Sequence, residues 1–121
     1  PPPDERKAFG EPISYRQAVA FNMSDIALEV EGMRLTTYRA ASLADQGKDF
    51  AQAAAVARKL SADKGFRIGS DAVQLLGGHG YVKEYPVERW HRDSKIFDIF
   101  EGTEQIQQLV ISRAISGLRI E

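Results

Sequence analysis

The chain has 121 residues, a formal net charge of −1, 43% hydrophobic and 27% charged residues, and no cysteine. These values are typical of one globular domain and exclude a disulfide framework, a thiolate nucleophile and a cysteine metal site. The basic residues are dispersed and no apolar run reaches the ~20 residues of a membrane span, so we expect a cytoplasmic protein that binds neither nucleic acid nor membrane.

Residues 1–12 are expected to form an extended N-terminal segment or linker, and residues 13–121 one helical domain. The first three residues are prolines, and without an initiating methionine this start reads as a cut end or a linker. A turn is predicted at Phe9–Ile13, because Gly10 permits unusual dihedral angles and Pro12 keeps Glu11 extended.

The first predicted helix begins at Ser14 and ends near Gln46. Ser14 and Gln17 form a capping-box pattern, and Gly47 supplies the stop. At about 1.5 Å per residue this helix is ~50 Å long, so we expect part of it to contact something beyond its own neighbours. Its apolar side chains recur at the three- and four-residue spacings of an amphipathic helix: Val19, Met23, Ile26, Ala27, Val30, Met33, Thr37, Tyr38 and Ala41.

The second predicted helix spans 50–76 and follows an N-cap at Asp49. Its first half is rich in alanine, which favours helix formation and lets a neighbouring helix approach closely. Gly65 and Gly69 are interpreted as sites of close packing, and Gly77–Gly78 as the end of the helix.

A short helix is predicted from Val87 to about Lys95, with Pro86 at its first position. Thr103 is expected to cap a last helix whose apolar residues reach Leu118. No strand is predicted. The fold class is therefore all-α, a four-helix up-and-down bundle with a Gly-rich loop.

The long connection before the last helix contains the residues that suggest a site, since extra loop length often has a functional reason. Glu88 and His91 form a Glu-x-x-His unit, but a di-metal bundle site needs two such units and two further glutamates. We therefore expect no metal, and interpret Trp90 and His91 as packing residues. Gly77–Gly80 suits either a phosphate contact or a plain helix stop, and the absence of a strand-to-helix context favours the stop.

Glu101 has two interpretations that its spacing alone does not separate. It suits a solvated carboxylate favoured by the positive end of the following helix. It equally suits a general base, because the apolar side offered by Phe100 would raise its affinity for protons.

Four stretches occur in a distinctive order and spacing: Glu5–Gly10 with Gln17–Ala18, Asp71–Tyr81, Glu84–Arg89 with Arg92–Ile96, and Phe100–Gln107. Together they resemble the C-terminal domain of the acyl-CoA dehydrogenase family. The resemblance implies a bundle of three long helices and one short one. Whole members of that family also contain an N-terminal helical domain and a middle β-domain, and nothing in this chain matches either.

By this resemblance, Glu101 abstracts the α-proton of a fatty acyl-CoA while the β-hydrogen leaves as hydride to FAD, and Gly102 lies beside the substrate thioester. The implied activity is the α,β-dehydrogenation of β-oxidation, carried out by the complete enzyme and not by 121 residues alone. The resemblance also implies a homodimer or a tetramer of two dimers, with an electron-transfer flavoprotein as acceptor. FAD contacts are implied at Arg6, Phe9 and Gln17, for the flavin of the neighbouring subunit, and at Gln74, Leu75, Gly77, Gly78, Thr103 and Gln105.

Two alternatives remain open from the sequence. One is a non-catalytic helical module for oligomerisation or interaction. The other is an acyl-CoA oxidase with the same fold.

Overall fold

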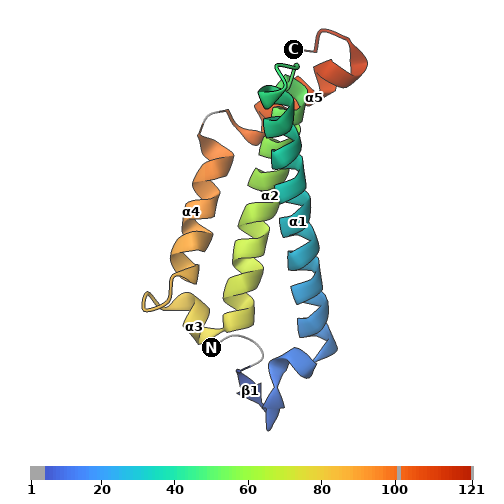
Figure 1. The fold of residues 1–121 in the computed structure, drawn as a ribbon. Coiled ribbons are helices and arrows are strands. Elements are labelled where there is room, and N and C mark those ends of the chain that lie inside the picture. The colour runs from blue at the N-terminus through green and yellow to red at the C-terminus, as the bar shows by residue number, and fades with distance from the viewer. Residues whose placement is uncertain (1–4, 101, 121) are drawn as a thin grey trace.

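The computed structural model describes residues 5–100 and 102–120, and within these ranges the chain is predominantly helical (Figure 1). The all-α prediction is therefore confirmed. The elements in chain order are β1 (Lys7–Ala8), β2 (Glu11–Pro12), the 3-10 helix η1 (Ile13–Tyr15), α1 (Gln17–Asp45), α2 (Ala51–Leu76), α3 (Gly78–Tyr81), α4 (Val87–Ile99) and α5 (Glu104–Ser116).

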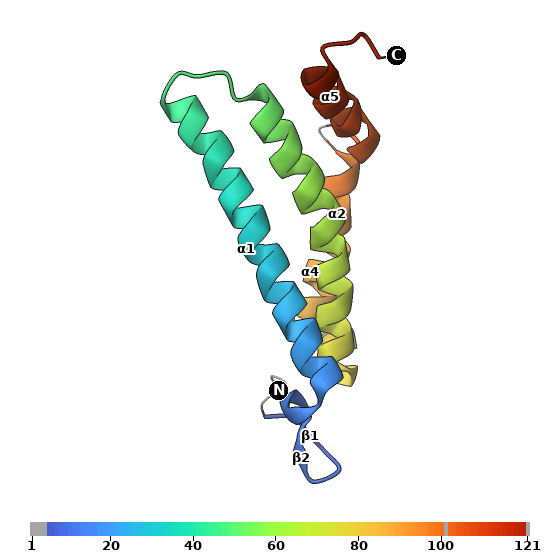
Figure 2. The same ribbon diagram turned by 90° about the vertical axis from the view of Figure 1, so that its right-hand side faces the viewer.

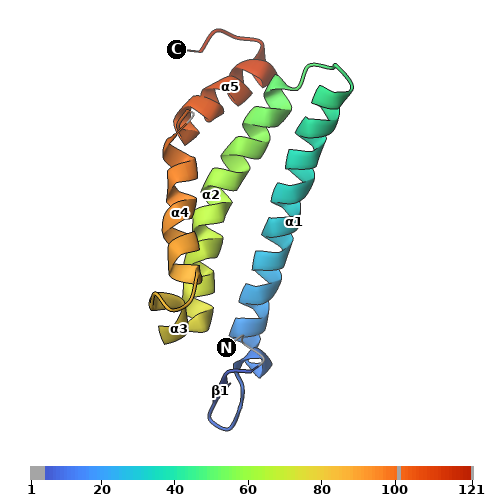
Figure 3. The ribbon, with the colours of Figure 1, turned by 60° about the vertical axis from the view of Figure 1, so that its left-hand side comes forward.

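Helix α2 is the element on which the other helices pack. It contacts α1, α4 and α5 along its length and α3 at its C-terminal end. In Figure 2, α1 and α2 run antiparallel and are joined at one end by the turn at Gly47, whose φ is 65°. Figure 3 shows α4 running back along α2 and α5 continuing toward the start of α2. Helices α1, α2 and α4 thus run alternately up and down with α2 in the middle, and α5 continues beyond α4 along the first half of α2.

The helix lengths refine the expected pattern of three long helices and one short one. Helices α1 and α2 have 29 and 26 residues, whereas α4 and α5 have 13 each. Helix α5 ends before Gly117, which takes the left-handed conformation and donates its N–H to Arg113 O at 2.9 Å. Helix α4 runs beyond Lys95 because no helix breaker precedes Gly102, and Lys95 pairs with Asp98 one turn later.

The predicted helix starts are corrected in detail. The capping box of Ser14 and Gln17 is wrong, because the chain forms η1 first and Gln17 is itself the first residue of α1. Asp49 does accept the N–H of Ala51 at 3.0 Å, although Phe50 occupies the cap position of α2. Similarly, Pro86 and Thr103 are the residues before α4 and α5, and neither α4 nor α5 has a side-chain cap hydrogen bond.

A β-hairpin at the N-terminal side was not predicted. Its two-residue strands pair Lys7 with Pro12 and Ala8 with Glu11, and Phe9 and Gly10 form the turn with φ of 57° and 86°. Two consecutive positive φ angles are what a tight hairpin turn requires. The turn predicted at this place is confirmed, while strands of two residues are too short to show a periodic pattern.

The buried apolar residues are nearly all alanines. Among the described residues they are Ile13, Ala40, Ala55, Ala57 and Ala62, so the alanine-rich half of α2 does face its neighbours. Such small side chains allow helices to approach closely.

The predicted close packing is confirmed at Gly69, one of the two glycines inside α2. A Cβ atom added at Gly69 would lie 3.1 Å from His91 Cα, so α2 and α4 pack tightly there. The same interpretation of Gly65 is wrong, because nothing lies within 4 Å of its Cβ position.

Helix α1 exposes a line of large apolar side chains. Phe21, Leu28 and Leu35 follow one another at seven-residue spacing, and each is more than half exposed. The expectation that α1 meets something beyond its neighbours stays a prediction, and this line is the surface that would carry it. No helix in the described ranges has both the length and the apolar character that crossing a bilayer requires.

Candidate functional site

The residues expected to form a site gather at the two ends of α2. At the C-terminal end, which we call the glycine end, Arg6 contacts Leu75 and lies against Gly77 within the segment 74–78. In the N-terminal half, which we call the loop end, Arg58 contacts Phe100 and Gly102, and Lys59 contacts Glu104. Eighteen residues of α2 separate Arg58 from Leu76, which corresponds to about 27 Å. One small molecule cannot bridge the two ends within a single chain unless it is very long.

The glycine end is built by a contact between residues far apart in the sequence. Arg6 Nη1 donates to Leu75 O at 3.0 Å, and the backbone of Arg6 accepts the N–H of Ile13 at 2.9 Å. The guanidinium thus caps one of the carbonyl groups left free at the end of α2, where the helix dipole also favours a cation.

Gly77 is favoured at this end by its backbone. Its φ of 58° and ψ of −132° are angles that residues with a Cβ atom rarely adopt, and the Arg6 guanidinium lies against it, with Nη1 2.6 Å from the position of a Cβ atom. The backbone of Gly78, by contrast, is open, since no described atom lies within 4 Å of its Cβ position. A cation held against open glycine backbone is a geometry that suits an anionic group such as a phosphate.

Phe9 and Gln17 lie on the N-terminal side and are exposed. Phe9 stands at the hairpin tip with 97% of its surface exposed and a left-handed backbone, which costs a residue with a Cβ atom roughly 1 kcal/mol or more. Gln17 is the exposed first residue of α1, and Gln74 is exposed near the end of α2. These side chains are accessible to a group outside the chain.

The loop end contains the predicted base position. Glu101 lies outside the described residues, so its role stays a prediction. Phe100 ends α4 and donates its N–H to Ile96 O at 3.0 Å, and Gly102 has a φ of 94°. Thr103 precedes α5, and both Thr103 and Gln105 are exposed.

Two basic residues of α2 hold this loop, and sequence reasoning missed both. Arg58 Nη2 donates to Phe100 O and, at 3.4 Å, to Gly102 O, while Arg58 Cζ lies 5.2 Å from the centre of the Phe100 ring. Lys59 pairs with Glu104, and the hydrogen bond between them raises the pKa of Lys59 above its ordinary 10.5. The only sequence signal was a pair of cations inside an alanine-rich helix.

The Glu-x-x-His unit of α4 has a packing environment. The ring of His91 stacks on Phe66 of α2 with centroids 4.7 Å apart, which confirms its packing role. The same interpretation of Trp90 is wrong, because its side chain is largely exposed. In the described part of the chain, no three metal-binding side chains gather as a possible ion site.

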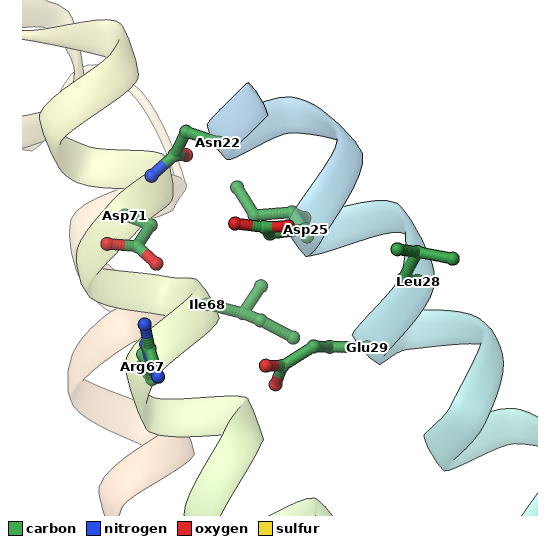
Figure 4. Close-up of a pocket in the computed structure, with 8 residues that line it drawn as sticks. Asn22, Asp25, Leu28, Glu29, Arg67, Ile68 and Asp71 are labelled. Carbon is green, nitrogen blue, oxygen red and sulfur yellow. The ribbon is translucent and has the colours of Figure 1, made fainter. Parts of the chain in front are cut away.

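A separate polar cavity of about 290 Å³ lies between α1 and α2 (Figure 4). Asp25 and Glu29 of α1 face Arg67 and Asp71 of α2 across it. Glu29 is paired with Lys64 at 2.9 Å. Among the described residues, none of those predicted for a site lines this cavity.

Comparison with known proteins identifies the fold. Residues 4–116 match the family model described as acyl-CoA dehydrogenase, C-terminal domain. The chain belongs to the acyl-CoA dehydrogenase family. The mitochondrial short-chain specific acyl-CoA dehydrogenase of Bos taurus is 46% identical over 109 residues, which are 90% of this chain and 26% of the bovine protein.

Solved structures of the acyl-CoA dehydrogenase fold agree. Butyryl-CoA dehydrogenase from Megasphaera elsdenii superposes with a TM-score of 0.91 at 38% identity, covering 93% of this chain and 30% of that one. The FAD complex of PigA gives a TM-score of 0.89 at 32% identity, again covering 93% and 30%. The chain therefore spans less than a third of the relatives that it matches, and the family resemblance inferred from the sequence is confirmed.

Proposed function

We propose that the chain is the C-terminal domain of an FAD-dependent acyl-CoA dehydrogenase that introduces the α,β double bond into an acyl-CoA. The observation that supports this most directly is the contact of Arg6 with Leu75 across 69 positions of sequence. Resemblance alone assigned both Arg6 and residues 74–78 to FAD. Their meeting in the fold brings a cation and open glycine backbone to one place.

The glycine end fits the cofactor. Arg6 offers a guanidinium against Gly77, and the open Cβ side of the adjacent Gly78 lets an anionic oxygen approach the backbone, so these residues would hold the pyrophosphate of FAD. Gln74 and Leu75 would lie along the adenosine, and exposed Phe9 and Gln17 would cover it from outside. When bound, FAD supplies the acceptor for the β-hydrogen as hydride.

The loop end supplies the base. Glu101 takes the α-proton of the acyl-CoA, with Gly102 beside the thioester and Thr103 and Gln105 directed to FAD. A carboxylate in water is too weak a base for such a proton, so exclusion of water has to raise its basicity. Glycine at position 102, with a φ of 94°, lets the chain pass the substrate without a side chain.

The separation of the two ends indicates an oligomer. Because about 27 Å of α2 lies between the loop end and the glycine end, the two ends serve different flavins. Each flavin site then takes the glycine end of one subunit and the loop end of another, so the active form is a homodimer or a pair of dimers. The electrons pass on to an electron-transfer flavoprotein.

The test is Glu101→Gln in the full-length enzyme that contains this chain. We expect FAD to stay bound, while reduction of the flavin by acyl-CoA slows by at least about 10²-fold, the usual contribution of a general base. The control is Glu31→Gln, the same substitution at an exposed residue of α1 that pairs with Arg34. A Glu101→Gln enzyme that is reduced at a near-normal rate contradicts the assignment.

The exposed line of Phe21, Leu28 and Leu35 favours one other function, a non-catalytic association module. That function predicts a protein without flavin, in which replacing Glu101 changes nothing. The flavin absorbance of the purified full-length protein distinguishes the two.

A further inference from the structure

We infer that Arg58 is the positioning residue for the general base, because its side chain binds the backbone on both sides of position 101. The inference rests on the proposed role of Glu101. Arg58 belongs to no sequence motif. It lies in α2, whereas position 101 lies between α4 and α5.

The contacts come from one nitrogen of the guanidinium. Arg58 Nη2 donates to Phe100 O and to Gly102 O, the latter at 3.4 Å. Its Cζ atom lies 5.2 Å from the centre of the Phe100 ring, within the range of a cation–π contact. The residues before and after the base position are thereby held by the same side chain.

The loop needs such a partner because its own structure is open. Phe100 has left the helix, with φ and ψ of −86° and 161°, so its carbonyl has no acceptor role inside α4. Gly102 has no side chain with which to anchor the loop. The carbonyl end of α4 also carries the negative end of the helix dipole, which favours a nearby cation.

Arg58 lies in a well-packed part of helix α2. Ala55, Ala57 and Ala62, which are buried, surround its position in the sequence. The Nε atom of Arg58 is buried and has no hydrogen-bond partner among the described residues. The guanidinium charge is therefore only partly compensated where it faces the loop.

Lys59 adds a second, separate attachment. It pairs with Glu104 in the first turn of α5, beyond the two residues that flank the base. Arg58 and Lys59 thus hold the loop at positions 100, 102 and 104. Of the two, only Arg58 contacts the immediate neighbours of Glu101.

Two consequences follow for the reaction and for the loop. Loss of the contacts lets the base leave the productive geometry, and a misplacement of about 1 Å can cost about 10²-fold in rate. Loss of the contacts also frees the backbone on both sides of position 101, so amide hydrogen exchange should speed up in this loop more than elsewhere in the bundle. A residue that only stabilised the fold as a whole would speed up exchange throughout the bundle.

The experiment uses the full-length flavin-containing enzyme with Arg58→Gln and Arg58→Lys. Arg34→Gln serves as matched control, because Arg34 makes only an exposed contact with Glu31 one turn away. For each enzyme, the rate of flavin reduction by acyl-CoA is measured together with substrate affinity and bound FAD. Amide hydrogen exchange of residues 99–105 reports on the loop directly.

We expect Arg58→Gln to reduce flavin roughly 10–100-fold more slowly with unchanged FAD content, and to speed exchange in residues 99–105 more than elsewhere in the bundle. Arg58→Lys, which keeps the charge and a hydrogen-bond donor, should recover part of the lost rate. An active parent whose Arg58→Gln variant has the same rate and the same exchange overturns the role of Arg58 alone. A parent that reduces no flavin with any acyl-CoA overturns the proposed function, and with it the catalytic part of this inference.

Discussion

Gly80→Ala tests the packing of α3 against α2. A Cβ atom at Gly80 would lie 2.6 Å from Val73 O and 2.9 Å from Val73 Cα. Both are backbone atoms that no rotamer change can move. Because a normal carbon–oxygen contact is about 3.3 Å, α3 would have to shift by about 0.7 Å. The shift also disturbs the hydrogen bond from Gly80 N to Gly77 O, which is 2.9 Å long.

The expected cost follows from these distances. Overpacking of this kind costs about 1–3 kcal/mol, and alanine returns up to about 1 kcal/mol of helix propensity. We therefore expect Gly80→Ala to lower the free energy of unfolding by about 1–2 kcal/mol. The assay is urea unfolding of the flavin-free protein, followed by helical circular dichroism.

Gly78→Ala is the matched control, because it lies in the same short helix. Nothing is within 4 Å of its Cβ position, and it should change stability by no more than the helix-propensity gain. If both variants unfold at the same urea concentration, the close approach of α3 to α2 is not the reason that position 80 favours glycine.

Two further predictions concern Lys59 and Phe9. Because the pKa of Lys59 is raised by its hydrogen bond to Glu104, the stability from this pair is complete below about pH 10.5 and is lost as the pH rises through the higher folded-state value. The difference in urea midpoint between the parent and Lys59→Met should therefore shrink above that pH, and a constant difference would show that the pair does not titrate. Phe9→Asn should stabilise the flavin-free protein by about 0.5–1 kcal/mol, since asparagine tolerates the left-handed backbone better. The same variant should weaken FAD binding by the full-length enzyme, and tight binding in a flavin titration would contradict the predicted contact.

The long helices were the most predictable part of the fold. Helices α1 and α2 follow from apolar spacing and from stop glycines, and the second starts within one residue of its expected position. The hairpin and α3 were missed because strands of two residues and a helix of four contain only about one repeat of their period, which is too little to recognise as a pattern. The predicted capping box is absent because Ser14 belongs to the 3-10 turn at Ile13–Tyr15 and Gln17 is already the first residue of α1.

The site was less predictable than the fold, because its contacts join distant residues. Composition and spacing gave no reason to pair Arg6 with Leu75, and only the family resemblance indicated a shared ligand. The only sign of Arg58 was its place as a cation in an alanine-rich helix, and its partners could not be inferred because they lie 42 and 44 residues away. Gly65 and Gly69 show the same limit: four residues apart on one helix, they read alike in the sequence, yet only Gly69 faces another helix.

The position of α2 between the two ends has a consequence for how the chain can vary. One uninterrupted helix carries Arg58 and residues 74–78, so removing a single residue between them would turn one end by about 100° relative to the other. Insertions and deletions there would misalign the two proposed flavin-binding ends at once, whereas many substitutions would leave both ends in register. The number of residues between Arg58 and Gly77 is therefore constrained more tightly than their identity.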